Sequence, residues 1–226
     1  MRLPIRVLLP VLLVAGPLLT GCGGPATVAV PDRPAGTKPQ ATTTPSTTTT
    51  PSATGAPDAP VAAASLGGPG TACALPVSFS LAKAWEPKAI RNPEDPEFAA
   101  LTRQGPTTAR CEVDAKPAGH LGFLRVWTAE KGSGPSPARA ALEGFVKAEK
   151  KASGVAYRET TAGALPAVEA TYTVRSALLD EEKEERAFAV ATPEGVVVVH
   201  LGGLDTEEHR AMLPAYELAR TTLKAS

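Results

Sequence analysis

Residues 186–201 read RAFAVATPEGVVVVHL, and this stretch decides the fold. Two runs rich in apolar residues, Arg186–Thr192 and Val196–Leu201, flank Pro193-Glu194-Gly195. A glycine in so short a connection supplies the positive φ that a tight hairpin requires. The run of four valines from Val196 to Val199 is typical of a central strand. We therefore expect an antiparallel hairpin whose second strand lies inside a sheet.

Alternating patterns on either side of the hairpin predict further strands. Residues 166–177 alternate, with Val168, Ala170, Tyr172 and Val174 on one face and Glu169, Thr171, Thr173 and Arg175 on the other. This pattern indicates a strand with one face in water. Residues 76–82 alternate as well, and we expect Trp85 to close that strand onto the core. Residues 110–116 and 121–130 predict a strand pair turned by Pro117-Ala118-Gly119.

Two helices are expected between and after the strands. Ser136 is a suitable cap and Pro137 a suitable first-turn residue for a helix that we expect to end near Gly154. Asp205, with Glu208 three residues later, predicts the start of a closing helix that Pro214 should kink or divide. The apolar stripes that should face the core are Ala138, Ala141, Leu142, Phe145 and Val146 in the first helix, and Met212, Leu213, Tyr216 and Leu223 in the second. The predicted fold class is α+β, an antiparallel sheet with helices packed on it.

The first 22 residues have the build of an export signal. Arg2 and Arg6 precede an apolar run from Val7 to Leu19. Such a run makes about 20 Å of helix, too short for a hydrocarbon core of about 30 Å, so we expect residues 1–21 to be a cleaved signal peptide. Leu19-Thr20-Gly21-Cys22 resembles the bacterial lipobox. That resemblance implies a lipid on Cys22, carried by acyl chains such as palmitate, and a membrane anchor.

Residues 22–70 predict a disordered tether, and residues 71–226 a single folded domain. The tether is mostly Ala, Pro, Thr, Gly and Ser, with too few large apolar side chains to repay the entropy of ordering. Such a linker has a root-mean-square reach of about 35–40 Å. The threonines between Thr42 and Thr50 resemble glycosylated stalks, and an unmodified spacer fits the sequence equally well.

Cys73 and Cys111 are the two cysteines of the predicted domain. In an exported domain a disulfide between them is the expected state, and it would close a loop of about 38 residues. A metal-binding or nucleophilic role is the alternative, but the chain has no Cys-x-x-Cys and no neighbouring His that would support it.

The order of strands and helices resembles the PsbP-like fold found in LpqN-type actinobacterial lipoproteins. The matching pieces are the strand before Trp85, the helix from Pro137 to Ser153, the hairpin around Gly195 and the closing helix. The segment Leu81-Ala82-Lys83-Ala84-Trp85 departs from the turn that members often carry. The resemblance implies a sheet covered by helices in an α/β/α sandwich, and accessory or binding roles more often than catalysis.

The sequence shows no motif for a catalytic, cofactor or metal site. His120, His200 and His209 lack zinc-site spacing, and we expect each to be structural or solvated. The acidic run from Asp180 to Glu185 lacks the spacing of a calcium loop, which favours a solvated connection between strands. Trp127, Phe123 and Tyr172 lie at strand spacing, which favours the core over a ligand platform.

Three functions remain open from the sequence. The first is a non-enzymatic module on the outer face of the cytoplasmic membrane that binds a protein, cell-wall or small lipophilic partner. The second is an envelope hydrolase whose residues converge only in the fold, and the third is a small-molecule or lipid carrier with an apolar cavity. The 23 basic and 23 acidic residues balance, so no nucleic-acid partner is expected.

Overall fold

The computed structural model describes residues 61–129 and 137–226, which fall in one compact unit. Residues 1–60 and 130–136 lie outside the described ranges, and with them the signal peptide, Cys22, most of the tether and Ser136. The strands are β1 Ala62–Leu66, β2 Val77–Ala82, β3 Glu86–Ala89, β4 Arg103–Gln104, β5 Thr107–Asp114, β6 Gly122–Ala129, β7 Ala152–Ala162, β8 Leu165–Arg175, β9 Glu182–Thr192, β10 Gly195–Gly203 and β11 Lys224–Ala225. The helices are α1 Pro96–Ala100, α2 Pro137–Ala148 and α3 Thr206–Thr222, with a 3-10 turn at Lys116–Ala118.

The architecture is α+β, as predicted, with a large antiparallel sheet at its centre. Its strand order is β3-β5-β6-β10-β9-β8-β7, and β4 adds to β5. The predicted hairpin is β9–β10, with Gly195 at a φ of 148°, and β10 lies in the middle of the order. A smaller sheet pairs β2 with β1 and β11.

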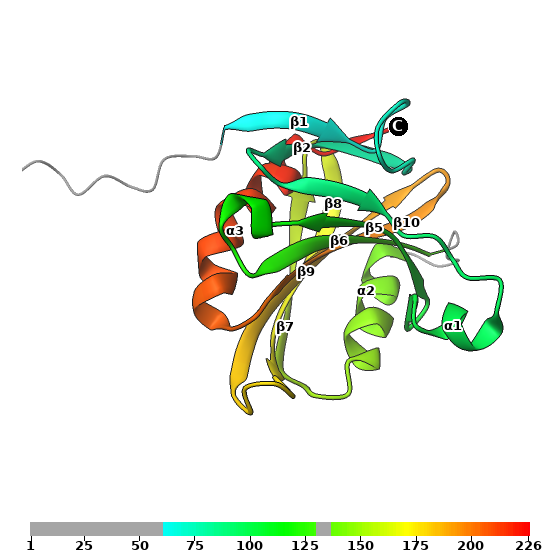
Figure 1. Ribbon diagram of the computed structural model, residues 1–226. Coiled ribbons are helices and arrows are strands. Elements are labelled where there is room, and N and C mark those ends of the chain that lie inside the picture. The colour runs from blue at the N-terminus through cyan, green and yellow to red at the C-terminus, as the bar shows by residue number, and fades with distance from the viewer. Residues whose placement is uncertain (1–60, 130–136) are drawn as a thin grey trace, which may run out of the picture. The chain divides into compact units, whose positions relative to one another are not determined.

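An apolar cluster lies on each face of the large sheet, between the sheet and the elements that pack on that face (Figure 1). On one face α2 packs over β8, β9 and β10, and its predicted stripe is buried, with Leu142 and Phe145 at 0% exposure. On the other face α3 and β2 pack together, with Val77, Trp85 and Tyr216 in one cluster with the valines of β10. Alternate residues of β10 therefore pack into two separate apolar cores, one on each face of the sheet, which explains the unbroken run of valines.

The first helix is shorter than predicted. α2 ends at Ala148, and residues 152–162 form β7, which the sequence analysis missed. The buried stripe of α2 stops at Val146, so a further turn of helix through Lys147, Lys150 and Lys151 would bury nothing. Gly154, the expected helix end, has a φ of 60° and lies at a bulge in β7.

The start of the folded part is also earlier than predicted. Ala62–Leu66 lies within the stretch expected to be tether, yet it forms β1 and pairs with β2. Four of its five residues are exposed, so its composition does not predict a strand. The pairing with β2 and the complete burial of Leu66 stabilise β1 instead. The prediction of disorder is wrong for these residues.

The closing helix starts where predicted but is not divided by its proline. The Asp205 side chain accepts a hydrogen bond of 2.8 Å from the Glu208 N–H, which is the expected cap. The helix runs through Pro214 to Thr222, with Met212 and Tyr216 buried and Leu213 partly buried. In the described ranges, no helix has the length and apolar character needed to span a membrane.

Candidate functional site

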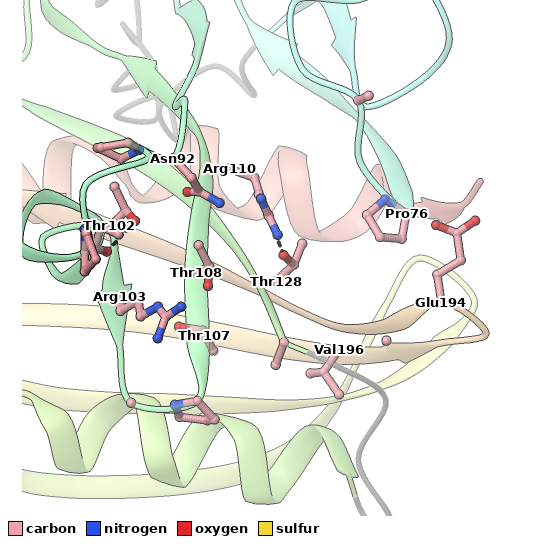
Figure 2. A pocket seen from close by; sticks show the side chains of 18 of the residues that line it. Pro76, Asn92, Thr102, Arg103, Thr107, Thr108, Arg110, Thr128, Glu194 and Val196 are labelled. Carbon is pink, nitrogen blue, oxygen red and sulfur yellow. Dashed lines mark hydrogen bonds between the residues drawn. The ribbon is translucent and has the colours of Figure 1, made fainter.

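A cleft of about 1330 Å³ opens at one end of the large sheet (Figure 2). Strands β4, β5 and β6 form its floor. One wall is the chain just before β2, a second is the segment from Asn92 that leads into β4, and the β9–β10 turn closes the end. The lining is rich in hydroxyl, amide and charged groups: Asn92, Glu94, Thr102, Arg103, Thr107, Thr108, Arg110, Thr128 and Glu194.

The floor carries a row of three polar side chains across neighbouring strands. Arg103 of β4 is directly opposite Thr108 of β5, and Thr108 is opposite Thr128 of β6. Directly opposed residues in an antiparallel sheet project from the same face with Cβ atoms about 5 Å apart. The strand registers therefore place one guanidinium and two hydroxyl groups side by side on the cleft floor.

Arg110 joins this row because β5 carries a bulge. Ala109 pairs with Trp127 and Cys111 with Val126, which leaves Arg110 as the extra residue. Bulges redirect a side chain without ending the strand. Here the Arg110 Nε donates a 3.0 Å hydrogen bond to the Thr128 hydroxyl, so a second guanidinium lies over the floor (Figure 2).

A disulfide ties one wall of the cleft to the floor. Cys73 and Cys111 are bonded, as predicted, with their Cα atoms 6.0 Å apart. Cys73 precedes Ala74 and Pro76 of the wall, and Cys111 follows Arg110 of the floor. The Ser226 N–H donates to the Pro76 carbonyl at 3.0 Å, so the end of the chain also holds this wall.

The second wall is fixed to α2. The Gln104 side chain donates to the Phe145 carbonyl at 3.2 Å. Gly105 has a φ of 56°, and a Cβ there would lie only 2.3 Å from the carbonyl oxygen of Gly144, so the backbones approach closely because the residue is glycine. Within this wall the Thr102 hydroxyl donates to the Ala99 carbonyl at 2.8 Å.

The charges of the cleft are separated along its length. Arg103 lies toward one end, and Glu194 and Pro76 lie toward the other (Figure 2). Neither arginine of the floor has a carboxylate within 4 Å among the described residues. The arrangement can bind a ligand by hydrogen bonds and charge.

A second polar cluster lies on the α2 face of the sheet, away from the cleft. Glu185 is 5% exposed and pairs with His200 of the neighbouring strand and with Lys183, whose Nζ is 2.5 Å from its Oε1. Burial alone would raise the pKa of Glu185, but the charges and hydrogen bonds of His200 and Lys183 outweigh it and hold the pKa below its usual value. Lys183 also donates to the Gly203 carbonyl at 2.7 Å.

Aromatic rings surround His200 in this cluster. It stacks on Tyr172, with centroids 6.5 Å apart, and meets Phe145 and Phe123 edge-on at 5.5 and 6.2 Å. Burial raises the pKa of the Tyr172 hydroxyl far above its usual value. Trp127 and Tyr172 are core residues, as expected, each with 4% exposure. The His200 ring is a packed part of the fold.

A third cluster corrects the prediction of a wet face for β8 at Glu169, whereas Arg175 at the end of the same face is exposed, as predicted. Glu169 is 2% exposed, because α3 covers this face. The Tyr216 hydroxyl donates to one Glu169 oxygen at 3.0 Å, and Arg158 donates to the other at 2.6 Å. Burial, followed by the charge of Glu169, raises the pKa of Tyr216.

The acidic run is only partly the solvated connection that was expected. β9 begins at Glu182, and Glu185 is buried, so the prediction fails for the second half of the run. Sequence reasoning missed the His200–Glu185 pair. The alternation of Lys183, Glu185, Ala187 and Ala189 was a signal that could have extended the strand and placed Glu185 on the α2 face.

The other histidines have unlike surroundings. His120 lies 3.5 Å from Glu208 and is partly exposed, whereas His209 is 2% exposed at the start of α3. Burial lowers the pKa of His209 to about 4. Across residues 61–129 and 137–226, no group of three or more His, Cys, Asp or Glu side chains could hold a metal ion.

The fold and cleft together define a class: a disulfide-bonded α+β domain with a polar surface cleft beside the edge of its sheet. A family model described as an uncharacterised lipoprotein matches residues 43–223, and the chain belongs to that lipoprotein family. Membership indicates attachment to a membrane. No curated protein matches the chain.

Proposed function

We propose that this lipoprotein is a non-enzymatic binding module held at the outer face of the cytoplasmic membrane. In this proposal residues 1–21 are removed, Cys22 carries the lipid, and the following Pro- and Thr-rich chain is the tether. The cleft over β5 and β6 binds the partner. The single observation that carries the binding role is the row Arg103, Thr108 and Thr128 on the floor of a walled cleft.

The place where the chain enters the domain supports the proposal. Val61, the first residue of the described part, precedes β1 at its Ala62 end. The wall residues Ala74 and Pro76 follow the other end of β1, and Figure 1 shows α1 on that side as well. Val61 therefore lies at the end of β1 away from the wall residues Ala74 and Pro76.

The hydroxyl groups of the cleft also favour binding over catalysis. Thr102 and Thr107 donate to the backbone carbonyls of Ala99 and Gln104, each at 2.8 Å. The Thr128 hydroxyl accepts from Arg110. A hydroxyl nucleophile needs a base that takes its proton, and a backbone carbonyl or a guanidinium does not act as one.

A carrier of small lipophilic molecules is the second candidate. A hollow of about 590 Å³ lies beside Leu165, Leu223 and Gly163, a volume suited to one small ligand. The proposal includes a PsbP-like fold for the domain, which is supported by a large sheet that is covered on both faces. The His200–Glu185 pair would be the starting point for a hydrolase, but it lies on the α2 face among aromatic rings.

Site-specific photo-crosslinking in intact cells tests the binding role. A benzophenone side chain replaces Asn92, an exposed cleft residue, or in the control Leu178, which is 79% exposed between β8 and β9. We expect one discrete product from position 92 and none from position 178. Equal labelling from both positions would contradict a role for the cleft.

The anchor has its own test. Replacing Cys22 by Ser should release the protein from the membrane fraction and abolish incorporation of labelled palmitate. Retention of the Cys22→Ser protein in washed membranes, together with lipid labelling, would contradict the proposed anchor.

A further inference from the structure

We propose that Arg103 and Arg110 form an anion subsite for a sugar that carries a carboxylate or phosphate group. This inference rests on the proposed binding role of the cleft and names its ligand. Thr108 is directly opposite Arg103 and is two residues before Arg110 on the same strand. Thr108 is thus the strand neighbour of both arginines, and all three side chains line the cleft (Figure 2).

The two arginines provide the charge. Both side chains are exposed to the cleft, and neither is neutralised by a carboxylate within 4 Å in the described part of the chain. Arg110 keeps its terminal N–H groups for a ligand because only its Nε bonds to Thr128. A planar guanidinium matches the two oxygens of a carboxylate or phosphate.

The rest of the cleft fits the hydroxylated body of a sugar. Thr108 and the Asn92 amide offer further donors and acceptors close to the arginines. Glu194 lies at the opposite end, where its carboxylate accepts hydrogen bonds from sugar hydroxyl groups and repels a second anion. The charge pattern therefore orients a ligand with its anionic group toward Arg103 and Arg110.

Ligand-observed NMR titrations of the full-length protein test this inference with three probes. The probes are glucuronate, glucose 6-phosphate and uncharged glucose. We expect at least one anionic sugar to bind about tenfold more tightly than glucose, because charge-assisted bonds to Arg are the stronger ones. Affinity for that sugar should fall as salt rises from about 0.05 M to about 0.5 M, with no such change for glucose.

Charge-removing variants assign the effect to the subsite. The double variant Arg103→Gln/Arg110→Gln should bind the anionic sugar no better than glucose. The control Arg175→Gln removes one positive charge, as each of the two single substitutions does, from a residue that is 53% exposed at the far end of β8, and it should bind as the unmodified protein does. A carboxylate preference and a phosphate preference both support the subsite, and the two anionic probes tell them apart.

Failure of the anion subsite can be distinguished from failure of the proposed binding role. Equal binding of glucose and both anionic sugars, unchanged in the double variant, overturns the anion subsite and leaves the cleft as a sugar site. Absence of binding by all three sugars overturns the inference. The crosslinks from position 92 then decide separately whether the cleft binds another kind of partner.

Discussion

The polar groups inside the domain and those of the cleft have the same chemistry but opposite surroundings. Glu169 and Glu185 are 2% and 5% exposed, and each is held by at least two cationic or hydroxyl partners. Arg103 and Arg110 lie on the same sheet, yet they are exposed and have no carboxylate within 4 Å in the described ranges. The buried clusters are therefore satisfied within the fold, whereas the two cleft arginines are exposed to solvent without a carboxylate partner in the described ranges.

Loss of the disulfide should give the largest effect, because it touches both regions. The bond closes a loop of 38 residues, and the loop-entropy relation gives a loss of about 4 kcal/mol in unfolding free energy for Cys73→Ala/Cys111→Ala. Chemical denaturation measures this. Since the bond joins a wall of the cleft to its floor, sugar affinity should fall as well under conditions where the variant is still folded. Unchanged affinity in the folded variant would contradict the role of the bond in shaping the cleft.

Truncation of Glu169 should come next. Glu169→Ala removes the acceptor of the buried Tyr216 hydroxyl and the partner of Arg158, and losing these two hydrogen bonds to a charged group costs about 3 kcal/mol. Urea titrations followed by fluorescence give the value. The matched control is Glu159→Ala, because Glu159 is 73% exposed and its loss should change stability by less than about 0.5 kcal/mol. Equal effects of the two variants would show that Glu169 is not the stabilising group described.

His209 should make stability depend on pH. Burial lowers its pKa from 6.5 to about 4, so the fold favours the neutral ring. Its contribution is complete above the unfolded pKa and is lost as pH falls, with a decrease of about 3 kcal/mol between about pH 7 and pH 4. The lowered pKa of Glu185 adds a loss of the same sign at still lower pH.

Unfolding free energies across this pH range test the His209 effect. The variant His209→Leu should show a shallower decline than the unmodified protein, whatever its absolute stability. His120→Gln, at a partly exposed site, is the control and should keep the full decline. A His209→Leu protein with the same pH slope as the unmodified protein would refute the assignment.

The smallest change in unfolding free energy is expected for substitutions of the cleft arginines. Arg103→Gln and Arg110→Gln should each change the unfolding free energy by less than about 0.5 kcal/mol, because both side chains are exposed. Thermal unfolding followed by circular dichroism measures this. A loss as large as that of Glu169→Ala would place the arginines among the stabilising groups and remove the distinction between the two regions.

The sequence predicts the elements whose patterns are local. The hairpin at Gly195, the α2 stripe ending at Val146 and the cap at Asp205 all follow from periodicity or turn chemistry within a short window, and the structure confirms them. The sequence pattern does not predict β1 and β7. β1 is exposed along most of its length, and β7 lies at the sheet edge with few buried residues.

The site could not be predicted, because its residues meet only through strand pairing. Arg103, Thr108 and Thr128 come from three strands, and a bulge adds Arg110. The burial of Glu169 likewise depends on α3, which comes much later in the chain. The disulfide is the exception, since the two cysteines of residues 71–226 have one possible internal pairing.

One paired measurement tests the separation of the two regions most directly. Unfolding free energy and the dissociation constant for the preferred anionic sugar are determined on Arg103→Gln/Arg110→Gln and on Glu169→Ala. We predict that the arginine variant keeps its stability and loses sugar binding by about tenfold, whereas Glu169→Ala loses about 3 kcal/mol of stability and still binds when folded. An arginine variant that binds the sugar as tightly as the unmodified protein would contradict it.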